Sequence, residues 1–215
     1  MLWILLTVAA APLQVARNAL QRGLVGDAGP WGATLVRFLF GLPFSLAIFG
    51  VVATLTPGAE PHLSVRFAIA VVAGAIAQVS ATAALLMAMR HSGFAVATFM
   101  QQASLPIAAV MGWLLFGDHL GPIQWGGLVA TTIGLLVLSW PRGDEARAGA
   151  LSGSVFGLAS GVAFAVALNG YRQAGLALDA DHPIYSATAA LCVAQTLQSI
   201  VLSAILAVTR PQALR

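Results

Sequence analysis

Apolar runs long enough to cross a lipid bilayer recur along most of this 215-residue chain. The hydrocarbon core of a bilayer is about 30 Å thick, so a helix needs about 20 apolar residues to span it. Because the runs do not alternate strictly between polar and apolar residues, they predict helices rather than barrel strands. Seven stretches qualify: residues 2–21, 31–54, 66–89, 93–116, 122–140, 150–171 and 183–209.

The composition indicates that lipid is the solvent of this chain. Hydrophobic residues make up 59% and charged residues only 8%, whereas about a quarter of the residues of a soluble domain are charged. The first run has no basic leader, and similar runs follow it, so we interpret it as a span and not as a signal peptide. The predicted fold class is therefore all-α, a polytopic membrane bundle with about seven transmembrane helices.

The charge pattern excludes several kinds of function. The net charge of +3 comes from ten arginines and seven acids, without any lysine, and the arginines are scattered singly between apolar runs, which does not fit nucleic-acid binding. The absence of lysine also excludes a retinal Schiff base. The single Cys192 allows no disulfide within the chain. The four histidines lie far apart in turns, so we expect neither a metal site nor a cofactor.

Polar side chains inside the predicted spans are the main candidates for a binding site, because each is costly in hydrocarbon unless it faces a partner or a watery cavity. They lie on several helices, which favours a polar cavity at the centre of the bundle. The predicted lining is Gln14, Asn18, Arg37, Gln78, Thr82, Gln101, Gln102, Asn169 and Gln195. Two alternatives remain open, namely interhelical hydrogen bonds for each amide and snorkelling of Arg37 to the interface.

Proline and glycine give two further predictions. Pro106 removes a backbone donor in mid-membrane, which predicts a hinge or a simple kink. Small residues four apart allow close helix packing. Such stripes occur at Gly126, Ala130 and Gly134, and at Gly153, Gly157 and Gly161.

The stretch from Ala83 to Trp140 carries a family resemblance. It contains an Ala-rich helix end, a tight turn at residues 90–93, an apolar run broken by Pro106, a Gly117-Asp118 turn and a glycine-rich helix. This order resembles the end of a five-helix repeat in EamA-type carriers of the drug/metabolite transporter superfamily, although Glu is more usual there than Asp118. The family pattern also includes an arginine early in its second helix, where this chain has Arg37. The resemblance implies a ten-helix fold of two inverted five-helix repeats.

Internal similarity agrees with a repeated architecture. Residues 15–18 align with residues 166–169, so that Asn18 corresponds to Asn169, and the charged stretch 141–149 is a natural linker. The predicted division is a first repeat at residues 1–140, a linker at 141–149, and the first two helices of a truncated second repeat at 150–209. A natural seven-helix protein is the alternative.

Two arguments about membrane orientation disagree. Six loop arginines fall on one side, namely Arg22, Arg90, Arg142, Arg147, Arg210 and Arg215, whereas only Arg66 and Arg172 fall on the other. By the positive-inside rule this count puts the N-terminus outside. The family resemblance implies the reverse, with both ends in the cytoplasm, and the sequence does not decide between them.

Acidic residues are confined to turns and loops: Asp27, Glu60, Asp118, Asp144, Glu145, Asp179 and Asp181. A proton-driven exporter of cations would need a carboxylate inside the membrane. A neutral, zwitterionic or anionic metabolite is therefore the more consistent substrate. The sequence does not specify its identity, the coupling ion or the direction of transport.

The resulting hypothesis is a secondary transporter that moves a small polar metabolite, such as an amino acid, nucleobase or organic acid, by alternating access. Enzyme activity is not expected, because Ser160 has no histidine at membrane depth to act as its base. The alternative is a membrane scaffold, or a half-carrier that pairs with another chain. The expected partners are the lipid bilayer of a bacterial inner membrane and a small-molecule substrate, with a homodimer left open.

Overall fold

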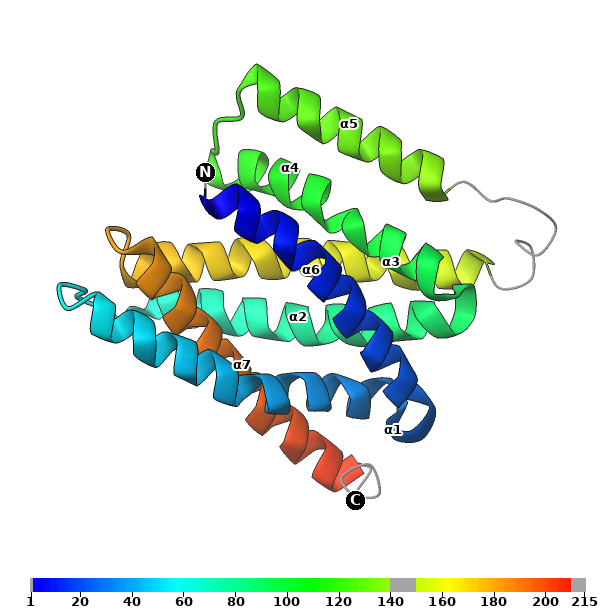
Figure 1. Ribbon diagram of the computed structural model, residues 1–215, viewed down its shortest axis with the longest axis horizontal. Coiled ribbons are helices and arrows are strands. Elements are labelled where there is room, and N and C mark those ends of the chain that lie inside the picture. Colours follow the sequence, from blue (N-terminus) through cyan, green and yellow to red (C-terminus); the bar gives the residue numbers. More distant parts are fainter. Residues whose placement is uncertain (1, 140–149, 210–215) are drawn as a thin grey trace.

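The structure, a computed structural model, describes residues 2–139 and 150–209, and these are helical apart from short connections. The described residues include no strand, which confirms the predicted all-α class. Figure 1 shows the helices in chain order. They are α1 (Leu2–Leu55), α2 (Val65–Ser92), α3 (Phe94–Gln102), α4 (Ser104–Phe116), α5 (Pro122–Ser139), α6 (Ala150–Leu178) and α7 (Pro183–Thr209).

Helix α1 consists of two helices joined at a sharp turn. Gly29 has φ 69° and ψ 173°, a backbone conformation that glycine adopts without a Cβ clash. Pro30 follows as the first residue of the next helix, where its missing N–H costs nothing. We call residues 2–28 the N-terminal half of α1 and residues 30–55 its C-terminal half. These halves correspond to the first two predicted spans.

The predicted span at residues 93–116 is broken into α3 and α4 at Ala103. Pro106 explains the break, because its ring opposes the carbonyl four residues earlier. That carbonyl belongs to Gln102, the last residue of α3. The tight Ala103 N to Met100 O hydrogen bond of 3.2 Å closes the last turn of α3. The proline therefore interrupts the helix one turn before its own position.

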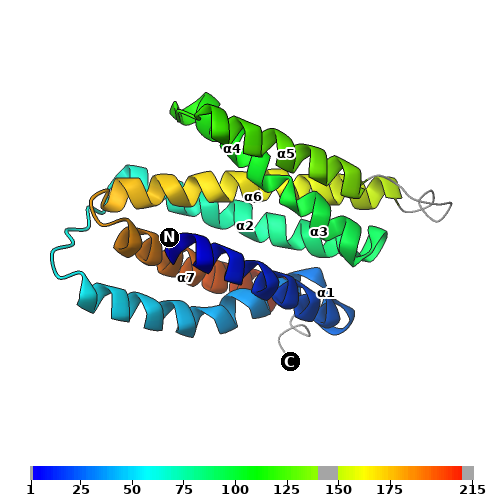
Figure 2. The ribbon, with the colours of Figure 1, turned by 45° about the horizontal axis from the view of Figure 1, so that its top comes forward.

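Helices α2 and α6 form the centre of the molecule and make its most extensive helix–helix contact. Figures 1 and 2 show them side by side, with α4 and α5 on one side and with α7 and the C-terminal half of α1 on the other. They run antiparallel, because the start of α6 at Gly153 contacts Ser92 at the end of α2, while Gly170 contacts Gly74. Every other described helix except α5 packs against one or both of this pair.

Glycines bring α6 close to its neighbours. A Cβ added at Gly153 would overlap the Ser92 side chain, and one added at Gly157 would lie 2.6 Å from Met100 Cβ. At Gly161 it would lie 3.0 Å from the Met100 carbonyl oxygen. Backbone therefore approaches backbone along this face of α6, where a larger residue would not fit.

The small-residue stripe on α5 behaves differently from the prediction. An added Cβ at Gly126 or Gly134 would meet nothing within 4 Å, and Ala130 is exposed. Within the described residues, this stripe therefore packs against no neighbouring helix. The reason is that α5 is peripheral and contacts α3 and α4 through other positions, including the edge-on contact of Trp125 with Trp113.

Five helices meet the length and composition requirements for crossing a membrane: Ala28–Leu55, Val65–Ser92, Phe94–Phe116, Gly153–Leu178 and Pro183–Thr209. The apolar part of α5, Pro122–Val137, is shorter. The number is lower than the seven predicted, and it refers only to the described residues. The predicted linker 141–149 and the arginines at 142, 147, 210 and 215 lie outside those residues, so the repeat boundary and the arginine count stay predictions.

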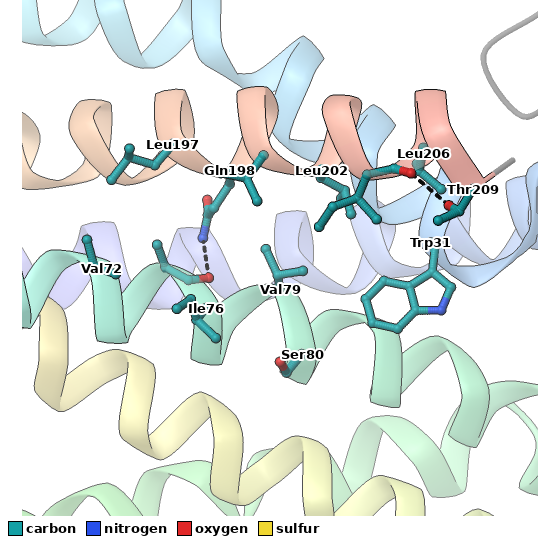
Figure 3. A pocket seen from close by; sticks show the side chains of 13 residues that line it. Trp31, Val72, Ile76, Val79, Ser80, Leu197, Gln198, Leu202, Leu206 and Thr209 are labelled. Carbon is teal, nitrogen blue, oxygen red and sulfur yellow. Dashed lines mark hydrogen bonds between the residues drawn. The ribbon is translucent and has the colours of Figure 1, made fainter. Parts of the chain in front are cut away.

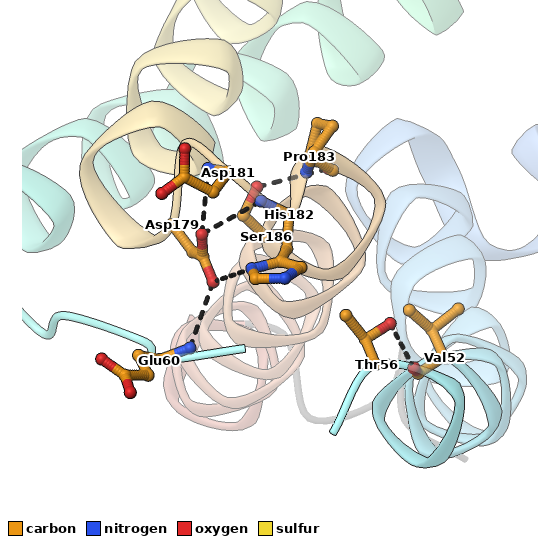
Figure 4. A network of polar contacts seen from close by, with 8 residues as sticks. All are labelled: Val52, Thr56, Glu60, Asp179, Asp181, His182, Pro183 and Ser186. Atoms are coloured by element: carbon orange, nitrogen blue, oxygen red, sulfur yellow. Dashed lines mark hydrogen bonds and ion pairs between the residues drawn. The ribbon is translucent and has the colours of Figure 1, made fainter. Parts of the chain in front are cut away.

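Asp179, in the loop between α6 and α7, contacts the loop between α1 and α2 (Figure 4). Its Oδ2 accepts a hydrogen bond from the backbone N–H of Glu60 at 3.2 Å and lies 2.9 Å from His182 Nδ1. Its Oδ1 accepts from the N–H groups of Asp181 and His182, each at 3.0 Å. Burial alone would raise the pKa of Asp179, but the hydrogen bonds from His182 and Asp181 lower it below its usual value. The carboxylate thus holds the α1–α2 loop against the start of α7.

Candidate functional site

Arg37 reaches into the bundle from the C-terminal half of α1. Its Nη1 donates a hydrogen bond to Thr82 Oγ1 at 2.8 Å, and Thr82 is fully buried on α2. The Thr82 hydroxyl in turn donates to the Gln78 carbonyl oxygen at 2.9 Å. A snorkelling arginine would hold its guanidinium at the membrane surface. The buried partner instead favours a position inside the bundle.

The Gln78 side chain connects three helices. Its Oε1 accepts hydrogen bonds from Tyr171 Oη of α6 at 2.6 Å and from Gln198 Nε2 of α7 at 2.9 Å. Gln198 Nε2 also lies within hydrogen-bonding distance of the Ala75 carbonyl oxygen, at 3.0 Å, and of Tyr171 Oη, at 3.0 Å. Arg37 and Thr82 join these side chains through the backbone carbonyl of Gln78, so the polar groups form one chain across α1, α2, α6 and α7.

A second polar group joins the N-terminal half of α1 to α3. Asn18 Nδ2 donates to Gln101 Oε1 at 3.3 Å, and both side chains are almost fully buried, at 1% and 3% exposed. Arg17 Nη2 donates to Asn18 Oδ1, also at 3.3 Å. Arg17 is itself exposed, so an arginine at the surface of the bundle is connected to a buried amide pair.

The remaining predicted lining residues do not join these groups by hydrogen bonds among the described residues. Asn169 is buried on α6, and its Nδ2 donates to the carbonyl oxygens of Ala108 and Ala165, each at 3.1 Å. Gln195 Oε1 is buried and has no partner in the part of the chain that the structure describes, Gln102 is half-buried and Gln14 is exposed. Five of the nine predicted residues are therefore connected in two networks: Asn18 and Gln101 in one, and Arg37, Gln78 and Thr82 in the other.

Sequence reasoning missed Arg17, Tyr171 and Gln198. Arg17 precedes Asn18 directly and could have been found as a second arginine inside a span. Gln198 lies almost one turn after Gln195 on the same helix, so its spacing carried a signal. Nothing in the sequence pairs Tyr171 with Gln78, because that contact depends on the register between α2 and α6.

A groove of about 570 Å³ lies between α2 and α7 (Figure 3). None of the nine predicted lining residues faces it, and Gln198 is the one amide among the described residues that line it. Because the groove lies between two membrane-spanning helices and its lining is apolar, it suits a lipid acyl chain better than a polar metabolite. The lining is mainly apolar: Trp31, Val72, Ala75, Ile76, Val79, Ser80, Leu197, Gln198, Val201, Leu202, Ile205, Leu206 and Thr209.

The comparison with known families decides the identity of the chain. The profile of the EamA-like transporter family matches residues 1–140, which is more than half of the 215 residues. The chain belongs to the EamA-like transporter family. As an EamA-like protein, it is an integral membrane protein of the drug/metabolite transporter superfamily, whose members transport and do not catalyse. Neither the curated proteins nor the solved structures include a significant match.

The polar networks of this EamA-like chain contain amides, hydroxyls and arginines, and no carboxylate among the described side chains takes part in them. The residues that the structure describes also include no group of three or more His, Cys, Asp or Glu side chains that could hold a metal ion. The chemistry available in these networks is hydrogen bonding and the binding of negative charge.

Asp118 of this EamA-like chain forms an ion pair at the end of the bundle that carries the α4–α5 turn. Arg172 of α6 contacts both carboxylate oxygens, with Nη2 to Oδ1 at 2.7 Å. Gly112 makes room for the carboxylate, since an added Cβ there would lie 2.5 Å from Asp118 Oδ2. The hydrogen bonds from Arg172 hold the pKa of Asp118 below its usual value. The pair therefore fastens the α4–α5 turn to α6.

Asp118→Asn is expected to lower the thermal stability at neutral pH, because it removes one charge of a bidentate pair. A carboxyl group with a lowered pKa in the folded state stabilises the protein fully above its unfolded pKa of about 3.9. That contribution is lost as the pH falls through the still lower folded pKa. Thermal unfolding of both proteins in detergent should therefore give a difference that is constant from pH 7 to about pH 5 and shrinks at lower pH. A difference that grows on acidification would contradict this account.

Proposed function

We propose that this EamA-like chain is a secondary transporter of a bacterial inner membrane that moves a small polar metabolite by alternating access. The observation that carries the proposal is the polar chain formed by Arg37, Thr82, Gln78, Tyr171 and Gln198 across four helices. Polar groups in a membrane interior need partners or a watery path. A route for a polar solute through the bundle gives such groups a function beyond packing.

The burial of the polar side chains inside the bundle supports a carrier rather than a scaffold. A scaffold that binds neighbouring proteins would present polar residues on its outer faces, whereas a carrier would present them inward. Asn18, Thr82, Gln101 and Asn169 are each at most 6% exposed. Of the nine predicted residues, Gln14 is the one that is exposed.

The break between α3 and α4 supports a moving part next to this site. Pro106 interrupts the helix just after Gln101, which contacts Asn18. Broken helices at membrane depth are a common feature of carrier binding sites. We propose that α4 changes its angle relative to α3 during the transport cycle, with Pro106 as the flexible point.

A second candidate is a half-carrier that assembles with another copy of the chain. The open stripe at Gly126 and Gly134 on α5 favours it, because small residues allow close approach of a further helix. In that arrangement the transport route would be completed by the partner.

Transport by purified protein tests the proposal. Proteoliposomes are loaded with an equimolar mixture of carboxylates, amino acids, uncharged polyols and amines, and the external solution is analysed by mass spectrometry. We expect at least one compound to leave faster than from protein-free vesicles. If every compound leaves at the protein-free rate while circular dichroism shows a helical protein, the transport function is refuted.

A further inference from the structure

Arg17 and Arg37 lie on the two halves of the N-terminal hairpin, each one helical turn from a contact between those halves. The halves of α1 turn back on each other at Gly29, and Gln21 Nε2 of one half donates to the Ala33 carbonyl oxygen of the other at 3.3 Å. Arg17 lies one helical turn before Gln21, and Arg37 lies one turn after Ala33. In a helix hairpin, equal steps away from the turn on both helices stay at the same level. The contact therefore sets Arg17 and Arg37 at the same level of the hairpin.

Both arginines have only neutral hydrogen-bond partners among the described residues. Arg17 donates to Asn18 Oδ1, and Arg37 donates to Thr82 Oγ1. The carboxylates that contact a basic side chain among the described residues are instead Asp118, paired with Arg172, and Asp179, hydrogen-bonded to His182, both at the ends of helices. Each guanidinium has five N–H donors, so most donors of the two arginines are free to bind an anion.

Electrostatics makes an anion the fitting ligand for this pair. Arg37 is half-buried and Arg17 is exposed on a membrane-length helix. Two like charges at one level of the hairpin repel each other and lose hydration beside lipid, which is costly unless a negative charge lies close by. A carboxylate between two guanidinium groups would offset both effects, because arginine forks match its two oxygens. Packing alone gives no reason to place two arginines at one level of a membrane hairpin.

A hydrogen-bond acceptor lies next to the helical turn that follows Arg37. Gln195 Oε1 on α7 is buried and has no hydrogen-bond partner among the described residues. The Gln195 side chain packs against Gly41, where an added Cβ would lie 3.2 Å from its Nε2. Gly41 lies one turn after Arg37 on the same helix. An acceptor one turn along the helix from Arg37, without a partner among the described residues, suits a ligand with a hydrogen-bond donor next to its negative charge.

We propose that Arg17 and Arg37 together bind the carboxylate of the transported metabolite, and that Gln195 accepts a hydrogen bond from a donor group on the same molecule. The ligand class is a small carboxylate that carries a hydroxyl or an amino group. This inference rests on the proposed transport function and names the substrate class of the same bundle.

Binding to the purified full chain tests the substrate class without any transport step. The probes are lactate, malate and alanine, each compared with its amide at constant ionic strength in detergent. A ligand that binds the folded state raises the unfolding temperature, so at least one carboxylate should raise it more than its own amide does. Equal effects of every carboxylate and its amide would overturn the proposal. A preference for lactate or malate over alanine would indicate a hydroxy acid, and the opposite preference an amino acid, both within the proposed class.

Variants assign the binding to the two arginines. Arg37→Gln and Arg17→Gln should each raise the half-saturating concentration about 10- to 100-fold, as expected for loss of hydrogen bonds to a charged group. Arg37→Lys should weaken binding less, because it keeps the charge but loses the fork. Arg66→Gln is the matched control, because Arg66 is exposed at the start of α2. The arginines are changed one at a time, so the test still holds if one of the two glutamine variants misfolds. Unchanged binding in both glutamine variants would refute the assignment.

The proteoliposome mixture separates this inference from the transport function itself. Release of carboxylates that is lost in Arg17→Gln and Arg37→Gln but kept in Arg66→Gln supports both. Release of polyols or amines alone, at the same rate in all variants, would overturn the inference and leave the transport function standing. Release of nothing would refute the transport function.

Discussion

Gly170→Leu is expected to lower the free energy of unfolding by about 1–3 kcal/mol through overpacking. An added Cβ at Gly170 would lie 3.0 Å from Gly74 Cα and 3.1 Å from the Ala70 carbonyl oxygen. Both atoms belong to the α2 backbone, so they cannot rotate away as a side chain can. The leucine therefore has to separate α2 from α6, the central pair of the bundle.

Separation of α2 from α6 is also expected to disturb the hydrogen bonds of the candidate site. Tyr171 follows Gly170 directly, and its hydroxyl donates to Gln78 across the α2–α6 contact. Moving the helices apart would lengthen this 2.6 Å hydrogen bond. Gly170→Leu should therefore reduce transport as well as stability.

Gly50→Leu is the matched control, because an added Cβ at Gly50 would meet nothing within 4 Å. Thermal unfolding followed by circular dichroism in detergent compares the two variants. Gly50→Leu should unfold near the wild-type temperature and Gly170→Leu well below it. Equal unfolding temperatures would show that α2 and α6 do not pack at these glycines.

Gln78→Leu is expected to lower the free energy of unfolding by about 1–3 kcal/mol, since it removes two interhelical hydrogen bonds that each contribute about 0.6 to 1.7 kcal/mol in membranes. The leucine leaves the Tyr171 hydroxyl and the Gln198 amide with fewer partners among apolar neighbours. A donor or acceptor left without a partner adds its own cost. The effect should be visible as a lower unfolding temperature in detergent.

Gln14→Leu provides the control for the same chemical change. Gln14 is exposed on the N-terminal half of α1 and makes no hydrogen bond within the part of the chain that the structure describes. A leucine there faces lipid, so it should leave stability unchanged or raise it slightly. If Gln14→Leu destabilised the protein as much as Gln78→Leu, the hydrogen bonds of Gln78 to Tyr171 and Gln198 would not explain the loss of stability.

The sequence was sufficient to predict the helices and several of the buried polar residues. Length and hydropathy located the helices, although five and not seven of the described helices qualify as membrane spans, and Pro106 marked the α3–α4 break. Residues such as Asn18, Thr82 and Gln101 could be singled out because a polar side chain inside a span is costly. These inferences depend on local sequence alone.

The contacts between helices could not be predicted in the same way. The spans are apolar on every side, so the periodicity that identifies the packed face of a soluble helix is missing. Register between helices therefore depends on side-chain packing. For that reason the Tyr171–Gln78 contact was missed, and the Gly126–Gly134 stripe was expected to pack although it lies open.

Water access to the polar networks is the central claim of this account, and single cysteines test it most directly. In a Cys192→Ala background, Thr82→Cys and Gln101→Cys probe the two networks, and Ile69→Cys probes the outer face of α2, where Ile69 is 66% exposed. A hydrophilic thiol reagent applied to membranes reacts only where water reaches. We predict labelling at positions 82 and 101 and none at 69. No labelling at either network position, in a folded protein, would contradict a transport route through the bundle.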